Sequence, residues 1–304
     1  MTNGDRVDPD AVRALIDAQF PHLSPSRVTY LGEGCDSAAF EVNGNWVFRF
    51  PKRADVEHQL LTEMRFLPHL RERSPVALPA YAFHGRPSAA FPRQFGGYPK
   101  LVGVPAILLE PGAMPLRAVA PVLGRFLSIV HAFPIDDAAD LGVPDQGTEA
   151  LLEEIRADAL DDFGLVRQEA PDAPLDCWRA YLESGLDPRA ARAGTPCLVH
   201  NDLAAEHILC DPIAGSVTGV IDWSDVAIGD PAADLAGMFH WGGEELASAV
   251  LSHYEGNGDD ALCARARFMA ACRGVADVAF GLGTCRREYV AAGLRALQLC
   301  AGGS

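Results

Sequence analysis

A short stretch in the second half of the chain combines the residue types that phosphoryl transfer needs. His200-Asn201-Asp202 is followed by His207, and Asp222 ends a later apolar run. In phosphoryl transfer one carboxylate orients the attacking hydroxyl and accepts its proton, while oxygen and nitrogen ligands hold Mg²⁺ on the phosphates. We therefore expect Asp202 to be the catalytic carboxylate, and His207 and Asp222 to hold Mg²⁺.

Each of these residues alone has a simpler interpretation. An isolated aspartate in a loop is usually a turn-former or a helix cap. An isolated histidine such as His207 is more often packed than ligating. The ordered combination is what indicates chemistry, whereas we expect His200 to support the loop.

The first hundred residues, which must position part of any such site, are predicted to be rich in β-strands. A helix is expected to begin at Asp8-Pro9 and to stop at Pro21. Asn43-Gly44 tolerates the positive φ of a tight hairpin turn. A second helix is predicted where apolar residues recur at helical spacing from Val56 to Leu70. The expected strands are 28–31, 38–42, 46–50, 78–83 and 107–109.

Helical patterns dominate after about residue 115. The expected helices are 116–133, 149–163, 175–184, 231–239, 244–254, 260–281 and 284–299. A strand pair is expected at 208–210 and 217–221. The chain is therefore predicted to be an α+β protein with two lobes. A small antiparallel β-rich nucleotide-binding lobe would span 1–100, and a larger, mainly helical catalytic and substrate-binding lobe would span 101–304, with the ligand site in the cleft between them.

The composition and net charge of the chain argue against some classes of binding partner. The formal charge is −16, from 25 basic and 41 acidic residues. A nucleic-acid partner is not expected because it needs a basic face, whereas an acidic surface attracts cationic ligands. No apolar run is long enough to span a bilayer, so no membrane association is expected. Eight scattered cysteines are typical of reduced thiols in a cytoplasmic protein.

The motifs resemble those of the aminoglycoside phosphotransferases, a family with a protein-kinase-like fold. The segment from His200 to Asp222 is similar to the family's catalytic loop and metal-binding aspartate. Asp230-Pro231-Ala232-Ala233-Asp234 is similar to its Gly-Asp-Pro-x-x-Asp motif, in which we expect both aspartates to be supports. The 2''-aminoglycoside phosphotransferases come closest because they too have His at the metal position. The resemblance covers nearly the whole chain and is densest at 31–63 and 198–236.

The resemblance implies a nucleotide site for ATP or GTP in the N-terminal lobe. Gly32 and Gly34 would let backbone N–H groups approach phosphates, and the Ser37 hydroxyl would bond one, although a two-glycine loop is otherwise an ordinary turn. Arg49 stands where kinases have a lysine that grips the phosphates and pairs with a helix glutamate, here Glu63. Arginine is bulkier and fork-shaped, so we expect an altered clamp.

The resemblance also implies a small cationic acceptor in a pocket lined by carboxylates. The candidate acceptor residues are Asp225, Trp241, Glu244, Glu245 and Glu288. Trp241 would stack on a sugar face or a macrolide, or would simply pack. Two alternatives stay open: a kinase for a macrolide or another small-molecule hydroxyl, and a nucleotide-binding protein without transfer activity.

Overall fold

The computed structural model describes residues 7–33, 36–110, 112–146, 149–187, 189–192, 194–256 and 261–302. The chain forms two compact units. Unit 1 consists of Met1–Glu72 and Ala77–Val102, and unit 2 of Arg73–Val76 and Gly103–Ser304.

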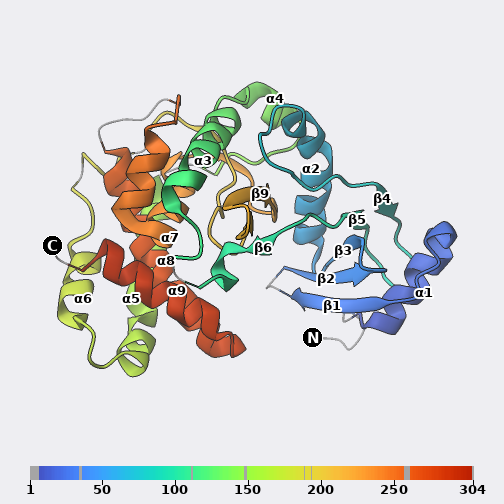
Figure 1. Cartoon of the computed structure of the whole chain (residues 1–304), viewed down its shortest axis with the longest axis horizontal. Coiled ribbons are helices and arrows are strands. Elements are labelled where there is room, and N and C mark those ends of the chain that lie inside the picture. The colour runs from blue at the N-terminus through green and yellow to red at the C-terminus, as the bar shows by residue number, and fades with distance from the viewer. Residues whose placement is uncertain are drawn as a thin grey trace. The chain divides into compact units, whose positions relative to one another are not determined.

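Unit 1 is built on a five-stranded antiparallel sheet with the strand order β1-β2-β3-β5-β4 (Figure 1). The strands are β1 (Val28–Glu33), β2 (Ser37–Val42), β3 (Trp46–Pro51), β4 (Phe83–Gly85) and β5 (Phe95–Pro99). Two helices, α1 (Pro9–Gln19) and α2 (Ala54–Arg71), and a short 3-10 helix (Pro21–Leu23) complete the unit.

The sequence of unit 1 explains both the turn between β2 and β3 and the composition of its core. Asn43 and Gly44 have φ values of 54° and 77°, which let β2 and β3 pair directly, with Val42 opposite Trp46. The core contains apolar residues of α1 packed with a group of phenylalanines: Phe40, Phe48, Phe50, Phe83, Phe91 and Phe95. The predicted hairpin and both predicted helices of this unit are confirmed.

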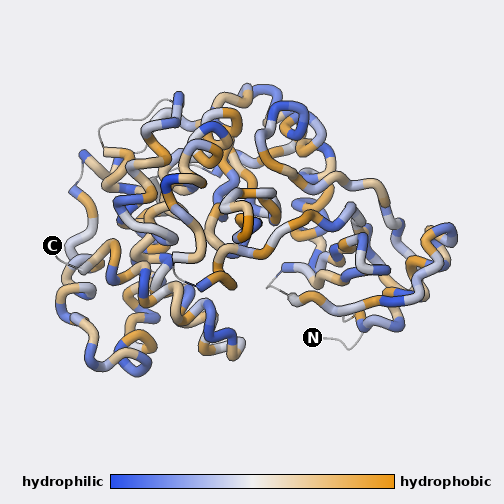
Figure 2. Tube along the Cα trace, viewed as in Figure 1, coloured by the Kyte–Doolittle hydropathy of each residue, from blue (hydrophilic) through white to orange (hydrophobic). Residues whose placement is uncertain are grey.

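Unit 2 is mainly helical. Its α-helices are α3 (Leu116–His131), α4 (Ile135–Asp140), α5 (Glu149–Glu169), α6 (Leu175–Ser184), α7 (Ala232–Leu251), α8 (Leu262–Thr284) and α9 (Arg287–Cys300). Helix α8 packs against α5, α7 and α9. Hydrophobic stretches alternate with hydrophilic ones along these helices, as expected where each buries one face (Figure 2).

Two small antiparallel sheets complete unit 2. One contains β6 (Val104–Pro105), β8 (Ile208–Asp211) and β9 (Ser216–Val220), and the other pairs β7 (Cys197–Val199) with β10 (Ala227–Gly229). These strands flank the segment that contains Asp202 and His207, so they fix where that segment begins and ends.

The predicted fold class is confirmed, but several predicted elements are wrong. Residues 107–109 are not a strand, because Ala106–Leu108 forms a 3-10 helix. Only Phe83 of the predicted strand 78–83 belongs to a strand. The predicted separation of helices 231–239 and 244–254 is confirmed, because α7 consists of two helical segments that meet at a kink at Gly243, where φ is 63°. No helix in the described residues is long and apolar enough to cross a membrane.

Candidate active site

A buried aspartate of α7, Asp234, anchors the segment between β7 and β8. The Asp234 carboxylate accepts hydrogen bonds from the backbone N–H groups of His200 (2.9 Å) and Asn201 (2.8 Å). Asn201 has a φ of 68°, a left-handed conformation that such a double anchor stabilises. The residue before Asp202 is therefore fixed at its backbone.

Asp234 is charged although it is fully buried. Burial by itself raises the pKa of this carboxyl, but the hydrogen bond from His131 Nε2 (3.1 Å) and the loop N–H groups outweigh burial and lower it. His131 is in turn held by the Tyr254 hydroxyl, 2.7 Å from its Nδ1. Asp234 thus supports the loop through its hydrogen bonds to two backbone N–H groups.

A close backbone approach adds a second anchor. At Gly237 of α7, an added Cβ would lie 1.5 Å from the carbonyl oxygen of Leu203. Only glycine lets the helix come this close to the residue that follows Asp202.

His200 supports the loop through a defined tautomer. Its Nε2 lies 3.0 Å from the carbonyl oxygen of Ile221, which can only accept, so the ring proton is assigned to Nε2. Nδ1 then accepts a hydrogen bond from the Asp202 N–H at 3.3 Å. Burial lowers the pKa of His200, which favours this neutral form. The ring also packs on Trp223, with the ring centroids 4.5 Å apart.

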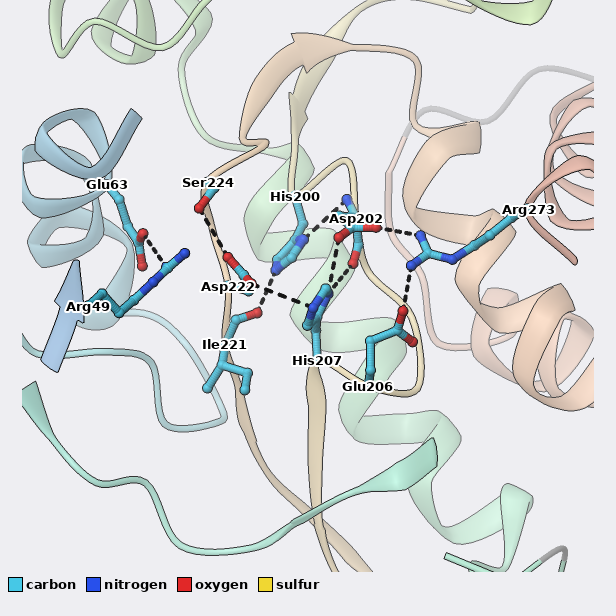
Figure 3. Close-up of polar contacts among 10 residues, drawn as sticks. All are labelled: Arg49, Glu63, His200, Asp202, Glu206, His207, Ile221, Asp222, Ser224 and Arg273. Atoms are coloured by element: carbon cyan, nitrogen blue, oxygen red, sulfur yellow. Dashed lines mark hydrogen bonds and ion pairs between the residues drawn. The ribbon is translucent and has the colours of Figure 1, made fainter. Parts of the chain in front are cut away.

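His207 and Asp222 face each other, as Figure 3 shows. His207 Nδ1 lies 2.8 Å from the Asp202 carbonyl oxygen, which places the proton on Nδ1 and a lone pair on Nε2. That Nε2 is 3.7 Å from Asp222 Oδ2. Burial lowers the pKa of His207, but the carboxylates of Asp202, Asp222 and Glu206 outweigh burial and raise it. This position therefore attracts positive charge.

The backbone of Asp222 is strained in a way that aims its side chain. Its φ of 63° is unusual for a residue other than glycine. Ser224 Oγ donates a hydrogen bond to Asp222 Oδ1 at 3.0 Å, which leaves Oδ2 facing His207. Such an unfavourable backbone conformation is typical of sites where a side chain must keep one orientation.

The residues present fit a divalent cation with few protein ligands. No group of three or more His, Cys, Asp or Glu side chains in the described part of the chain forms a complete metal site. Mg²⁺ commonly takes only one or two carboxylates from the protein and completes its shell with phosphate oxygens and water. Asp222 Oδ2 and His207 Nε2 suit that arrangement, although imidazole is a better ligand for Mn²⁺ than for Mg²⁺.

Two residues at this site were not predicted from the sequence. Arg273 of α8 donates from Nη1 to Asp202 Oδ1 (2.5 Å) and from Nη2 to Glu206 Oε1 (2.7 Å), so it bridges the two carboxylates (Figure 3). Burial alone raises the pKa of Glu206, but Arg273, with His207 and His240, lowers it to about 2. Arg273 lies in a helix with no motif around it, so no signal in the sequence pointed to it.

Residues 27–268 match the phosphotransferase enzyme family. The chain belongs to this family. Its structure is similar to the GDP and kanamycin complex of APH(2'')-IIIa, with a TM-score of 0.71 and 29% identity over 94% of this chain and 96% of that one. It is also similar to macrolide 2'-phosphotransferase type I, with a TM-score of 0.64 and 28% identity over 100% of both chains.

A curated relative agrees with this assignment. Viomycin phosphotransferase of Streptomyces vinaceus is 33% identical over 116 residues, which cover 31% of this chain and 40% of that protein. As a member of the family, the chain is a small-molecule kinase with a protein-kinase-like fold.

The residues predicted to bind the nucleotide lie in unit 1. Arg49 of β3 and Glu63 of α2 form a buried ion pair, with Nη1 and Oε2 2.8 Å apart. Gly32 lies at an irregularity where β1 pairs with β2, and Ser37 begins β2. Gly34 lies outside the described residues. The arginine thus pairs with the glutamate as a lysine of this family's kinase-like fold is expected to do.

The residues predicted to bind a cationic acceptor lie in unit 2, and three of them already pair with arginines. Glu244 pairs with Arg267, and Glu288 pairs with Arg286 at 2.9 Å. Glu245 Oε1 lies 4.0 Å from an arginine, Arg117. The two others are half-buried: Trp241 in α7, and Asp225 between β9 and β10.

Proposed function

We propose that the protein transfers the γ-phosphate of ATP or GTP to a hydroxyl of an antibiotic, with an aminoglycoside as the first candidate acceptor. The observation that carries the proposal is the arrangement around Asp202. Its carboxylate is anchored by the loop and by Arg273, and Nε2 of His207 and Oδ2 of Asp222 face each other beside it. Phosphoryl transfer needs little more than such positioning and charge neutralisation.

Asp202 orients the acceptor in this proposal. Its Oδ1 is occupied by Arg273, while Oδ2 lies 3.3 Å from His207 Nδ1, whose proton is directed to a backbone carbonyl. Oδ2 therefore retains the capacity to accept the proton of the attacking hydroxyl. A bound Mg²⁺, held by His207 and Asp222, would neutralise charge on the phosphates.

We assign nucleotide binding to residues 1–100 and acceptor binding to residues 101–304. Arg49, held by Glu63, would contact the phosphates, with Gly32, Gly34 and Ser37 beside them. The GDP bound to APH(2'')-IIIa supports a purine nucleotide as co-substrate. We place the activity in the cytoplasm, where nucleoside triphosphates are available, with antibiotic resistance as its role.

Two observations favour an aminoglycoside. The chain has a formal charge of −16, which raises the local concentration of a polycation. Kanamycin is bound in the structure of APH(2'')-IIIa. In this assignment Asp225, Trp241, Glu244, Glu245 and Glu288 contact the acceptor.

A less charged acceptor, such as a macrolide, is the second candidate. The observation that favours it is the pairing of Glu244 with Arg267 and of Glu288 with Arg286, because a carboxylate that already has a guanidinium partner attracts an ammonium group less strongly. The similarity to macrolide 2'-phosphotransferase type I is consistent with this candidate.

The test is phosphoryl transfer with ATP and with GTP, in Mg²⁺, across aminoglycosides, macrolides and viomycin, with the product identified by mass spectrometry. We expect Asp202→Asn to lower kcat by about 10²- to 10⁴-fold with the melting temperature and nucleotide affinity unchanged. Asp161→Asn, at an exposed position of α5, removes the same charge and should have no effect.

Two results would contradict the proposal. A near-normal rate in Asp202→Asn would remove Asp202 from the mechanism. Magnesium-dependent nucleotide binding without transfer to any acceptor would favour a nucleotide-binding protein without transfer activity.

A further inference from the structure

Arg273 places a positive charge between two carboxylates, one of which is the proposed catalytic group Asp202. Its guanidinium sits between the carboxylates of Asp202 and Glu206, at 2.5 and 2.7 Å. The side chains of Arg273 and Asp202 are partly exposed (24% and 29%), whereas that of Glu206 is buried (7%). Arg273 therefore reaches from the protein interior to the reacting carboxylate.

The neighbours of Arg273 show that it compensates more negative charge than Asp202 alone. Asp277, one turn further along α8, is also buried, and its Oδ2 lies 2.9 Å from His240 Nε2. Glu206 Oε2 has no hydrogen-bond partner, and neither does Arg273 Nε, among the described residues. Asp202, Glu206 and Arg273 together have a net charge of −1; without the arginine it would be −2.

We propose that Arg273 has two effects in the reaction. It holds Asp202 in the orientation in which Oδ2 meets the acceptor hydroxyl, and its charge disfavours acceptors with an ammonium group beside that hydroxyl. The proposal rests on the kinase function proposed above. It narrows the acceptor class to compounds whose reacting hydroxyl is flanked by neutral groups, such as other hydroxyls.

The first effect follows from geometry. An aspartate side chain with one oxygen held by a guanidinium cannot rotate freely, so Oδ2 keeps one direction. A displacement of about 1 Å in a reacting group can lower a rate by roughly 10²-fold. Arg273 is therefore a positioning residue that acts through Asp202.

The second effect follows from charge. An ammonium group beside the reacting hydroxyl would lie close to the guanidinium and would be repelled by it. An ammonium cannot accept a hydrogen bond from Arg273, whereas a hydroxyl can.

The test separates the two effects with two variants. Arg273→Met removes both the orientation of Asp202 and the positive charge. Arg273→Met combined with Glu206→Gln removes the orientation but restores the net charge of the three positions to −1. Arg179→Met, which breaks an exposed pair with Glu183 in α6, is the charge-matched control.

The measurements are the Kd of kanamycin by calorimetry at low salt and kcat with any accepted hydroxyl. We expect Arg273→Met to bind kanamycin about tenfold more tightly while kcat falls by roughly 10²-fold. The double variant should return to the wild-type Kd and keep the low kcat. Arg179→Met should match the wild type in both. In Arg273→Ala, added guanidinium ion should restore part of kcat.

Equal kanamycin affinity in the wild type and Arg273→Met, or no binding by either, would overturn the charge effect. An unchanged kcat in Arg273→Met would overturn the orientation effect. Weaker kanamycin binding together with a lower melting temperature would indicate a purely structural role. If the wild type phosphorylates no acceptor, the proposed function fails; kanamycin binding still decides the charge effect, and hydrolysis of GTP by water replaces kcat.

Discussion

Each unit of the protein contains an arginine that pairs with a carboxylate, and the two ion pairs differ in burial. Arg49 and Glu63 in unit 1 are almost fully enclosed, with side-chain exposures of 9% and 0%. Arg273 and Asp202 in unit 2 are 24% and 29% exposed, and the arginine is shared with Glu206. The enclosed ion pair holds Arg49 in one orientation with little contact with water, whereas Arg273 is partly solvated and divides its hydrogen bonds between two carboxylates.

The comparison predicts that neutralising a carboxylate lowers the free energy of unfolding more when its side chain is more deeply buried. Breaking a buried pair leaves a charge without compensation, whereas an exposed charge is solvated by water. Four carboxylates span the range: Glu63 and Asp234 at 0% exposure, Asp222 at 40% and Glu244 at 57%.

The largest effect is expected at Glu63. Glu63→Gln would leave the Arg49 guanidinium buried without its counter-charge and should lower the free energy of unfolding by about 3–5 kcal/mol. Denaturant unfolding measures the change, and nucleotide affinity should fall with it. Arg49→Lys, which keeps a positive charge, should lose less. A Glu63→Gln variant as stable as the wild type would show that burial does not decide the difference between the two arginines.

The next effect concerns Asp234, a buried carboxylate whose partners are backbone N–H groups and His131. Asp234→Asn should cost roughly 2 kcal/mol at neutral pH because hydrogen bonds to a charged group are lost. The loop would loosen, so kcat should fall as well. A loss below about 0.5 kcal/mol, as for an exposed charge, would show that burial does not set the size of the effect.

The pH dependence of stability tests Asp234 further. Its pKa is lower in the folded protein than in the unfolded chain. The contribution of the Asp234 carboxylate to the free energy of unfolding is therefore complete above about pH 4. It is lost as the pH falls through the folded-state pKa of this group. Urea unfolding at neutral and acidic pH should show a smaller acid loss in Asp234→Asn than in the wild type. The same acid loss in both would assign it to other carboxyls.

A more moderate effect is expected for the proposed cation ligands. Asp222→Asn should raise the Mg²⁺ concentration needed for half-maximal activity by about 10- to 100-fold, with stability little changed because the Asp222 side chain is 40% exposed. His207→Asn should instead lower activity with Mn²⁺ relative to Mg²⁺, since the amide oxygen suits Mg²⁺ better than imidazole does. Titration of each variant with both ions measures these changes, and an unaltered preference in His207→Asn would remove His207 from the cation site.

The smallest effect is expected at Glu244, whose pair with Arg267 lies at the surface. Glu244→Gln should change the free energy of unfolding by less than about 0.5 kcal/mol. If Arg267 satisfies this carboxylate, KM for kanamycin should stay within about twofold of the wild type. A KM increase of tenfold or more would support the proposed contact of Glu244 with the acceptor, whereas an unchanged KM would remove Glu244 from the acceptor site.

Local sequence patterns were enough for much of the secondary structure and for the order of the motifs. The helix predicted at 175–184 is α6 with the same bounds, and the Asn43-Gly44 turn has the positive φ values that its residues favour. These features depend on residues a few positions apart, so periodicity and turn chemistry detect them. The roles of Asp202, His207 and Asp222 as chemical groups stay predictions.

The surroundings of those groups depend on contacts between residues that are far apart in the sequence. The strands β7 and β10 are three residues each, and they pair with each other across a long stretch of chain. Neither strand is therefore detectable from the pattern of its own neighbouring residues. Arg273 meets Asp202 across 71 residues of chain, and Arg265 meets Asp230 across 35. A guanidinium on a helix looks the same in sequence whether it faces water or a buried carboxylate. The order of the motifs therefore predicts the class of chemistry, while the packing of α8 against its neighbours sets which charged group meets the Asp202 carboxylate.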